Sequence, residues 1–291
     1  FELSPANTGE FFHAALDHLH RNLAAQHTSI AEISSQQLQQ QIRSITQELL
    51  RLPQFQILNS SNRMQYLSRQ LAKTIRQVSW TIHQQLQRSQ VRPFKTEVLF
   101  GQVGSQEGLR PLEFQLSQQH TVKVRGKIDR IDLLQKDQQT YLGIVDYKSS
   151  QHKFNFRDAY YGVSLQMLTY LDALIKNFDL LLPKMQPDPA GAVYLHLQDP
   201  KLDLKDVLQT PFEQAWLKKN KYEGLLLAEP ELLELLDQEL TQDKSGVSLV
   251  YPFRRRKDGS YAATGKNDPQ LITKNQLKLL LWHNELLIQQ A

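Results

Sequence analysis

The hydrophobic periodicity of the chain changes at Arg92 and Pro93, and this change limits the fold to a helical segment followed by a sheet. Before this point, apolar residues recur at intervals of three and four, and we expect amphipathic helices over residues 8–26, 35–52 and 62–90. After it, the sequence consists of short stretches rich in Val, Ile, Phe and Tyr, which favour β-strands. The chain therefore begins as a helical part and continues as an α/β protein.

The later elements indicate a mixed sheet, because a strand, a helix and a further strand in this order are typical of a crossover unit. We expect strands at residues 95–100, 112–116, 121–134, 141–148 and 190–197, and a helix at residues 156–177. Beyond residue 200 we expect an acidic helix near residues 230–240, a basic loop at residues 251–261 and a C-terminal helix from Pro269 to Gln290.

The composition excludes several classes of protein. The 291 residues carry a net charge of +4 and are 40% hydrophobic, as in an ordinary globular protein. The chain has no cysteine, which excludes a disulfide scaffold, a cysteine nucleophile and a thiolate-bound iron–sulfur cluster. Because it shows neither a secretory pattern nor a run of roughly 18 to 20 apolar residues, we expect a protein of the reducing cytoplasm. Its mildly basic surface permits a nucleic-acid partner.

Two segments carry most of the candidate chemistry: GKIDRID at residues 126–132 and VDYKS at residues 145–149. Alternate residues of a strand share a face, so Asp146 and Lys148 project to the same side. If the two strands pair, the Asp129 carboxylate joins that of Asp146, and a hard divalent cation would relieve the repulsion between them. Each of these charges could instead form a solvated ion pair. Asp146, however, follows an apolar run, where an ionised carboxylate is costly unless it is paired or metal-bound.

Other positions are less informative by themselves. A lone histidine on a helix, such as His13, is usually a surface or satisfied core residue. Gln166 and Tyr170 lie four residues apart and share one helical face, where they could be a solvated amide and a core ring or could contact a nucleic acid. The basic run at residues 254–257 could be a solvated loop or could contact phosphates.

Taken in chain order, Gly9 with His13, then GKIDRID, then DYKS, then Gln166 with Tyr170 resemble the RecB-family branch of the PD-(D/E)xK nucleases. GKIDRID, DYKSS and YYGVSLQMLTYLDAL are most similar to the C-terminal nuclease domains of the AddB/RexB family. The resemblance implies an α/β, restriction-endonuclease-like core with a mixed central sheet flanked by helices, an N-terminal helical segment and a helical C-terminal extension. We place these three parts at residues 1–92, 93–200 and 201–291, within one compact domain.

The resemblance also implies roles for individual residues. Asp129 and Asp146 match the metal-binding aspartates, and Lys148 matches the lysine that positions or polarises the attacking water. His13 and the backbone carbonyl of Tyr147 would complete the metal ligands.

Further positions match parts that support the site or contact DNA. Gln166 and Tyr170 match the motif that does both, and Glu97 stands where relatives often carry a glutamate. The additional DNA-contacting candidates are Tyr160, Tyr161, Arg254, Arg255 and Arg256.

The implied activity is a Mg²⁺-dependent exodeoxyribonuclease, with Mn²⁺ as a substitute, that hydrolyses a single strand during the repair of double-strand breaks. The implied partners are single-stranded DNA, an AddA/RexA-type helicase–nuclease subunit and the rest of its own AddB/RexB-type subunit, since a chain that begins at Phe1 reads as a piece of a longer polypeptide. Many AddB and Cas4-like proteins hold an iron–sulfur cluster with four cysteines. The lack of cysteine here favours the cluster-free RexB-like variants.

Two other functions stay open from the sequence. One is a catalytically inactive domain that threads or binds DNA, against which the intact Asp129, Asp146 and Lys148 argue. The other is a stand-alone structure-selective or restriction-type endonuclease, against which the histidine motif and the implied longer parent argue.

Overall fold

The computed structural model describes residues 5–102, 108–116, 120–150, 152–197, 202–240, 244–265 and 270–290. The chain divides into two compact units. Unit 1 comprises residues 1–88, 147–151 and 196–220, and unit 2 comprises residues 89–146, 152–195 and 221–291. In the described ranges, no helix is long and apolar enough to span a membrane.

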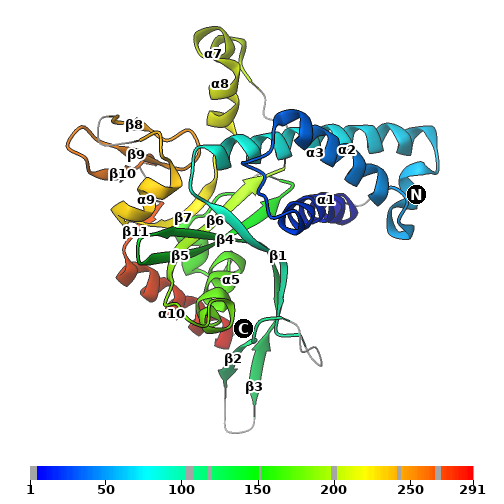
Figure 1. Cartoon of the computed structure of the whole chain (residues 1–291). Coiled ribbons are helices and arrows are strands. Elements are labelled where there is room, and N and C mark those ends of the chain that lie inside the picture. Colours follow the sequence, from blue (N-terminus) through cyan, green and yellow to red (C-terminus); the bar gives the residue numbers. More distant parts are fainter. Residues whose placement is uncertain are drawn as a thin grey trace. The chain divides into compact units, whose positions relative to one another are not determined.

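Unit 1 is helical (Figure 1). Its elements are α1 Pro5–Ala25, α2 Ser35–Leu49, the 3-10 helix η1 Pro53–Asn59, α3 Asn62–Gln87, α7 Leu204–Gln209 and α8 Phe212–Lys219. Helices α1, α2 and α3 pack on one another, and α8 packs on α3. The predicted apolar stripe of α1 is buried, with Phe12, Leu16, Leu19 and Leu23 at most 4% exposed. The helical prediction for the segment before Arg92 is confirmed.

Capping side chains explain where these helices begin. The Ser34 hydroxyl accepts a hydrogen bond from the backbone N–H of Gln37 at 3.2 Å, and the Gln37 side chain accepts one from the backbone N–H of Ser34 at 2.8 Å. Ser61 caps α3 in the same sense, by accepting from the backbone N–H of Met64 at 3.3 Å. These bonds satisfy N–H groups that have no partner within the helix.

Unit 2 contains a six-stranded sheet in the order β1-β4-β5-β6-β7-β11. Its strands are β1 Arg92–Phe100, β4 Gly126–Lys136, β5 Gln139–Lys148, β6 Asp188–His196, β7 Glu223–Leu227 and β11 Leu271–Ile272. The β1–β4, β4–β5 and β6–β7 pairs are antiparallel, whereas β7 and β11 are parallel. The sheet is therefore mixed, as predicted. Almost every residue of β5 is buried, so this strand lies in the core.

The remaining elements of unit 2 cover or extend the sheet. The helices are α4 Phe156–Tyr160, α5 Gln166–Ile175, α6 Phe178–Leu181, α9 Pro230–Leu236 and α10 Lys274–Gln290. The short strands are β2 Leu112–Gln115, β3 Thr121–Val124, β8 Gly246–Val247, β9 Phe253–Arg255 and β10 Tyr261–Ala263. Helices α5 and α9 contact β4, and α10 packs on α5 (Figure 1).

Three details differ from the sequence-based expectations. The helix expected over residues 156–177 is broken, because Gly162 adopts a left-handed φ of 74° that ends α4 before α5 begins. The strand expected over residues 121–134 is two strands, of which β3 pairs with β2 and β4 joins the main sheet. None of the strands β7 to β11 was expected after residue 200, and the expected basic loop at residues 251–261 contains β9 and the start of β10. The predicted start of the last helix, Pro269, lies outside the described residues.

The contact between α5 and α10 contains a buried carboxyl group whose ionisation should affect stability. The Asp172 side chain is 5% exposed, and this burial raises its pKa from 3.8 to about 6 although Lys176 lies 3.2 Å away. Glu285 of α10 pairs with the same Lys176.

We expect the free energy of unfolding to fall as the pH rises from about 4 to 7, because folded Asp172 keeps its proton over a range in which the unfolded chain has lost it. The rise from 3.8 to about 6 corresponds to a loss of up to about 3 kcal/mol. Thermal melting at pH 4.5 and 7.5 checks this, since the stability of an Asp172→Asn variant should increase relative to that of the wild type as the pH rises. A constant difference between the two proteins would contradict it.

Candidate functional site

Three neighbouring strands of unit 2 carry acidic residues at neighbouring register positions. In the β1–β4 pair, Thr96 lies opposite Arg130 and Val98 opposite Ile128, so Glu97 lies opposite Asp129. In the β4–β5 pair, Arg130 lies opposite Val145, and the next residues on these two strands are Asp129 and Asp146. The predicted pairing of the Asp129 strand with the Asp146 strand is confirmed.

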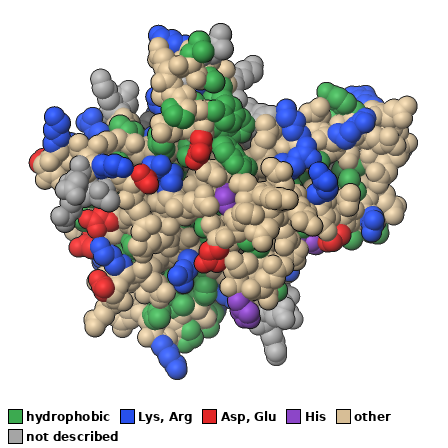
Figure 2. Space-filling model, turned by 45° about the horizontal axis from the view of Figure 1, so that its top comes forward, with side chains coloured by type: hydrophobic (Ala, Val, Ile, Leu, Met, Phe, Trp, Pro, Cys, Tyr) green, Lys and Arg blue, Asp and Glu red, His purple; other side chains and the backbone are tan. Residues whose placement is uncertain are grey.

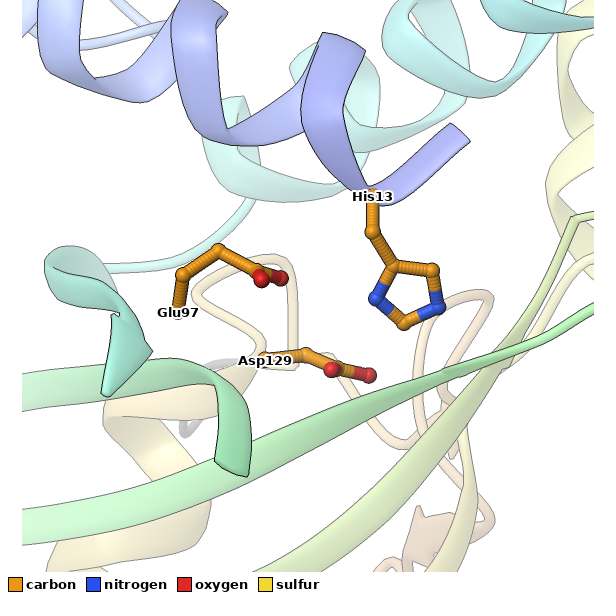
Figure 3. Close-up of side chains that lie close together, drawn as sticks. All are labelled: His13, Glu97 and Asp129. Atoms are coloured by element: carbon orange, nitrogen blue, oxygen red, sulfur yellow. The ribbon is translucent and has the colours of Figure 1, made fainter. Parts of the chain in front are cut away.

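The Glu97 and Asp129 side chains form a close acidic pair. Their carboxylate oxygens lie within 4.8 Å of each other, and Figure 3 shows both side chains. The Glu97 side chain is 17% exposed and Asp129 is 5% exposed, so the pair is largely removed from water. The Lys127 ammonium forms an ion pair with Glu97 and compensates part of this charge.

Glu97 has an unusual backbone for a residue within a strand. Its φ of 51° is left-handed, a conformation that costs a residue with a Cβ about 1–3 kcal/mol and often marks a functional position. The sequence resemblance gave only a weak indication of Glu97. The structure places Glu97 beside Asp129. The alternation of side chains along the strand could not have predicted the left-handed backbone of Glu97.

A buried tyrosine, Tyr194, lies near Asp146, and the sequence pattern did not predict it. Asp146 is 6% exposed and Tyr194 of β6 is 3% exposed. Burial, together with the Asp146 charge, raises the pKa of Tyr194 to about 12, against the opposite effect of a hydrogen bond to the Ser164 side chain. Since β6 follows β5 in the sheet order, a polar residue near the end of this predicted strand was the available signal.

Tyr147 and Lys148 follow Asp146 at the end of β5. Lys148 projects to the same side of β5 as Asp146, as the strand period predicts, and it is half-buried. Tyr147 between them packs its ring against that of His13, with 5.8 Å between the ring centroids and an edge-to-face geometry. Both rings belong to unit 1. The ligand roles of His13 and of the Tyr147 carbonyl stay predictions.

Gln166 and Tyr170 act as a pair on α5. The Gln166 amide donates a hydrogen bond to the Tyr170 hydroxyl at 3.0 Å, as expected for residues four apart on one face. The Tyr170 ring meets Phe100 edge-on at 5.6 Å, and both rings pack over Gly126 at the start of β4. Tyr170 is thereby fixed at the end of the strand that carries Asp129.

Gly126 is required for this packing, and we expect Gly126→Ala to disrupt it. An added Cβ would lie 2.6 Å from the Phe100 ring and 2.9 Å from the Tyr170 ring, so the rings must shift. We expect a loss of about 1–3 kcal/mol in the free energy of unfolding, measured by chemical denaturation. Gly246→Ala is the matched control, since its Cβ would meet Leu240 at an ordinary 3.5 Å. Equal effects of the two substitutions would contradict the argument.

The predicted DNA-contacting residues lie in two places within unit 2. Tyr160 and Tyr161 of the α4 end are 61% and 69% exposed, and Tyr160 stacks on His283 of α10 at 4.8 Å. Arg254 and Arg256 are exposed at the β9–β10 hairpin. Arg255 is only 9% exposed and lies over the Tyr261 ring, which favours a structural role for it.

Asp132, on the strand of Asp129, has a different role. Its carboxylate forms an ion pair with the Arg130 guanidinium at 2.8 Å, and Arg130 also donates a hydrogen bond to the Tyr222 hydroxyl at 2.9 Å. Arg130 is 0% exposed and Asp132 is 5% exposed. Because residues 130 and 132 alternate with 129 along β4, this buried pair lies on the opposite face of the sheet from Asp129.

Comparison with known families agrees with this geometry. The family model of the PD-(D/E)XK nuclease superfamily matches residues 1–267. The chain belongs to this superfamily. As a PD-(D/E)XK chain it is 53% identical over 290 residues to the B subunit of the ATP-dependent helicase/deoxyribonuclease of Lactiplantibacillus plantarum, and the match covers 99% of this chain and 24% of the relative.

The proteins of the same name from two other bacteria are also similar to this PD-(D/E)XK chain. The one from Latilactobacillus sakei is 44% identical over 300 residues, covering 100% of this chain and 25% of the relative. The one from Enterococcus faecalis is 40% identical over 284 residues, covering 98% of this chain and 23% of the relative. The chain thus spans about a quarter of the length of these relatives. The predicted family and fold are confirmed.

The acidic pair of this PD-(D/E)XK chain fits a hard divalent cation. Glu97 and Asp129 offer carboxylate oxygens within 4.8 Å, and oxygen ligands of this kind suit Mg²⁺ and Mn²⁺. The ion pair between Lys127 and Glu97 indicates that positive charge is favourable at this point. The chain has no cysteine, so it offers no thiolate, the ligand that soft metals prefer.

Proposed function

We propose that this chain is the metal-dependent exodeoxyribonuclease domain of a bacterial helicase–nuclease complex that processes double-strand DNA breaks for recombinational repair. The observation that carries the proposal is the close pair of Glu97 and Asp129, with Asp146 on the next strand, in a chain of the PD-(D/E)XK nuclease superfamily. The names of its relatives, each the B subunit of a helicase/deoxyribonuclease, support the same assignment.

In this proposal Glu97, Asp129 and Asp146 hold one or two Mg²⁺ ions, which Mn²⁺ can replace, with His13 and the Tyr147 carbonyl as additional ligands. The bound metal would lower the pKa of a water molecule and offset charge on the phosphoryl oxygens. Hydrolysis by water needs no covalent intermediate with the enzyme.

Lys148, Tyr194 and the pair of Gln166 with Tyr170 have distinct tasks. Lys148 places a positive charge on the Asp146 side of β5, where it orients the attacking water and offsets charge that develops on the phosphate. The Tyr194 phenol, with a pKa of about 12, stays protonated at neutral pH and can donate a hydrogen bond. The Gln166 and Tyr170 pair supports the start of β4 and contacts the DNA strand.

We propose single-stranded DNA as the preferred substrate. The exposed Tyr160 and Tyr161 rings offer faces for stacking, and stacking requires unpaired bases. Arg254 and Arg256 would add contacts to phosphates. The net charge of +4 is modest, so an AddA/RexA-type helicase subunit and the rest of the AddB/RexB-type subunit would deliver the strand and supply most of the affinity.

The proposal predicts metal-dependent cleavage of linear single strands. We expect faster cleavage of a linear single-stranded oligonucleotide than of its duplex in Mg²⁺, no cleavage in EDTA, and recovery after addition of Mg²⁺ or Mn²⁺. Circular single-stranded DNA should resist, because an exonuclease needs an end. Sequence-specific cleavage of duplex DNA would overturn the proposal in favour of a restriction-type enzyme.

Metal binding has a readout that does not depend on activity. Isothermal titration with Mn²⁺ should show binding that Glu97→Gln weakens, because this substitution removes one of the two closely spaced carboxylates. Glu113→Gln, at an exposed glutamate of β2, is the control and should leave binding unchanged. Equal Mn²⁺ affinity of the Glu97→Gln variant and the wild type would remove Glu97 from the metal site.

A further inference from the structure

Unit 1 contains a groove of about 380 Å³ outside the acidic site. Three helices line it: α2 with Leu38, Gln39, Ile42 and Arg43, α3 with Lys73, Arg76, Gln77 and Trp80, and α8 with Phe212 and Trp216. On α3, Arg76 and Gln77 each lie three or four positions from both Lys73 and Trp80, so the four residues form one face of the helix. The groove is therefore formed by the surfaces of three helices that pack together within unit 1.

Three aromatic side chains line the groove: Trp80, Phe212 and Trp216. The rings of Trp80 and Trp216 meet edge-on at 6.1 Å, and Phe212 lies 5.6 Å from Trp216 at a tilt of 36°. The Trp216 indole N–H donates a hydrogen bond to the Thr81 hydroxyl at 2.8 Å, which fixes this ring from behind. Phe212 is 53% exposed, so one ring stands open to solvent at the edge of the groove.

The charged residues of the groove all carry the same sign. Arg43, Lys73 and Arg76 are exposed, and no acidic residue lines the groove among the described residues. Figure 2 shows Lys and Arg side chains over α2 and α3 and hydrophobic side chains gathered along the α7–α8 hairpin. An occupant of matching chemistry needs flat apolar groups for the rings and negative charges for the cations.

We propose that this groove is a second binding site for single-stranded DNA, in which bases stack on Phe212 and Trp80 while Arg43, Lys73 and Arg76 contact the phosphates. Single strands combine exposed base faces with a regular series of negative charges, and proteins bind them through aromatic rings beside cationic side chains. The volume of about 380 Å³ suits one or two bases rather than a duplex. The inference rests on the proposed function, because that function supplies a single strand to the chain.

Fluorescence anisotropy in EDTA tests the site without any cleavage. The probes are a labelled 15-residue oligothymidylate and an abasic strand with the same number of phosphates. We expect the wild-type chain to bind the thymidylate more tightly. Phe212→Ala should weaken that binding about five- to 150-fold, because loss of one stacking ring removes about 1–3 kcal/mol, and should leave binding of the abasic strand nearly unchanged. Tyr66→Ala is the matched control, since Tyr66 of α3 is 56% exposed and lies outside the groove.

The cations give a separate signature. The double variant Arg43→Gln/Arg76→Gln should weaken binding of both probes and make the salt dependence shallower, by about 1.4 in the slope of log K against log salt for two lost phosphate contacts. Arg51→Gln, an exposed residue of unit 1 outside the groove, should not change the slope.

Three results would overturn the inference: no measurable binding of the thymidylate by the wild type, equal binding of the two probes, or no effect of Phe212→Ala. If Phe212→Ala instead weakened only association with an AddA/RexA-type partner, the groove would be a protein-docking surface. These binding outcomes do not depend on hydrolysis. A chain that fails to cut DNA would refute the proposed nuclease function, and the binding measurements would still show whether the groove binds single-stranded DNA.

Discussion

Replacing Asp146 with Ala should abolish nuclease activity while the fold remains intact. Metal catalysis supplies several kcal/mol of transition-state stabilisation, and a loss of about 4 kcal/mol lowers the rate about 10³-fold. Asp146 is buried at 6% exposure beside the strand of Asp129, so the substitution also removes repulsion between like charges. We therefore expect a change of less than about 1 kcal/mol in the free energy of unfolding.

The measurement compares the rate of single-strand cleavage and the thermal midpoint of each variant. Asp129→Ala should behave like Asp146→Ala, since the two residues lie side by side on β4 and β5. Glu113→Gln is the control for the loss of a carboxylate elsewhere in unit 2. If Asp146→Ala lost stability in proportion to activity, Asp146 would be a structural residue and the proposed site would lack one of its ligands.

The fold could be predicted from sequence wherever one period runs through a whole element. The apolar residues of α1 fit a helical period only, and β5 contains an apolar run at residues 141–145, so both elements were correctly predicted. The prediction failed where a single glycine changes the backbone, as at Gly162, or where a strand is as short as β11. A strand of two residues has too few side chains to show a period.

The site could be predicted where its residues follow from strand alternation. Asp146 and Lys148 share a side because their positions differ by two, and Asp129 joins them through the predicted pairing. The Glu97 and Asp129 contact needs the register of β1 against β4 and the left-handed φ of Glu97. The environment of Tyr194 needs the sheet order, which places β6 next to β5. These are long-range properties that no local pattern contains.

Breaking the buried pair of Arg130 and Asp132 should cause a large loss of stability, in contrast to the small change expected for Asp146→Ala. Asp132→Ala leaves the guanidinium of Arg130, which is 0% exposed, without its carboxylate. Breaking a buried ion pair by removing one partner costs about 3–5 kcal/mol. In a domain of this size this corresponds to a thermal midpoint lower by on the order of 5–10 °C.

A double substitution separates the cost of the lone charge from the value of the pair. Arg130→Met/Asp132→Leu removes both charges and fills the space with apolar side chains, which in other buried pairs is neutral or stabilising. We expect it to recover most of the stability that Asp132→Ala loses, although Tyr222 then lacks the hydrogen bond from Arg130. Differential scanning calorimetry of both variants beside Asp129→Ala gives the comparison. Asp129 and Asp132 lie three residues apart on β4, on opposite faces of the sheet. Equal thermal midpoints for their alanine variants would contradict the assignment of a chemical role to Asp129 and a structural role to Asp132.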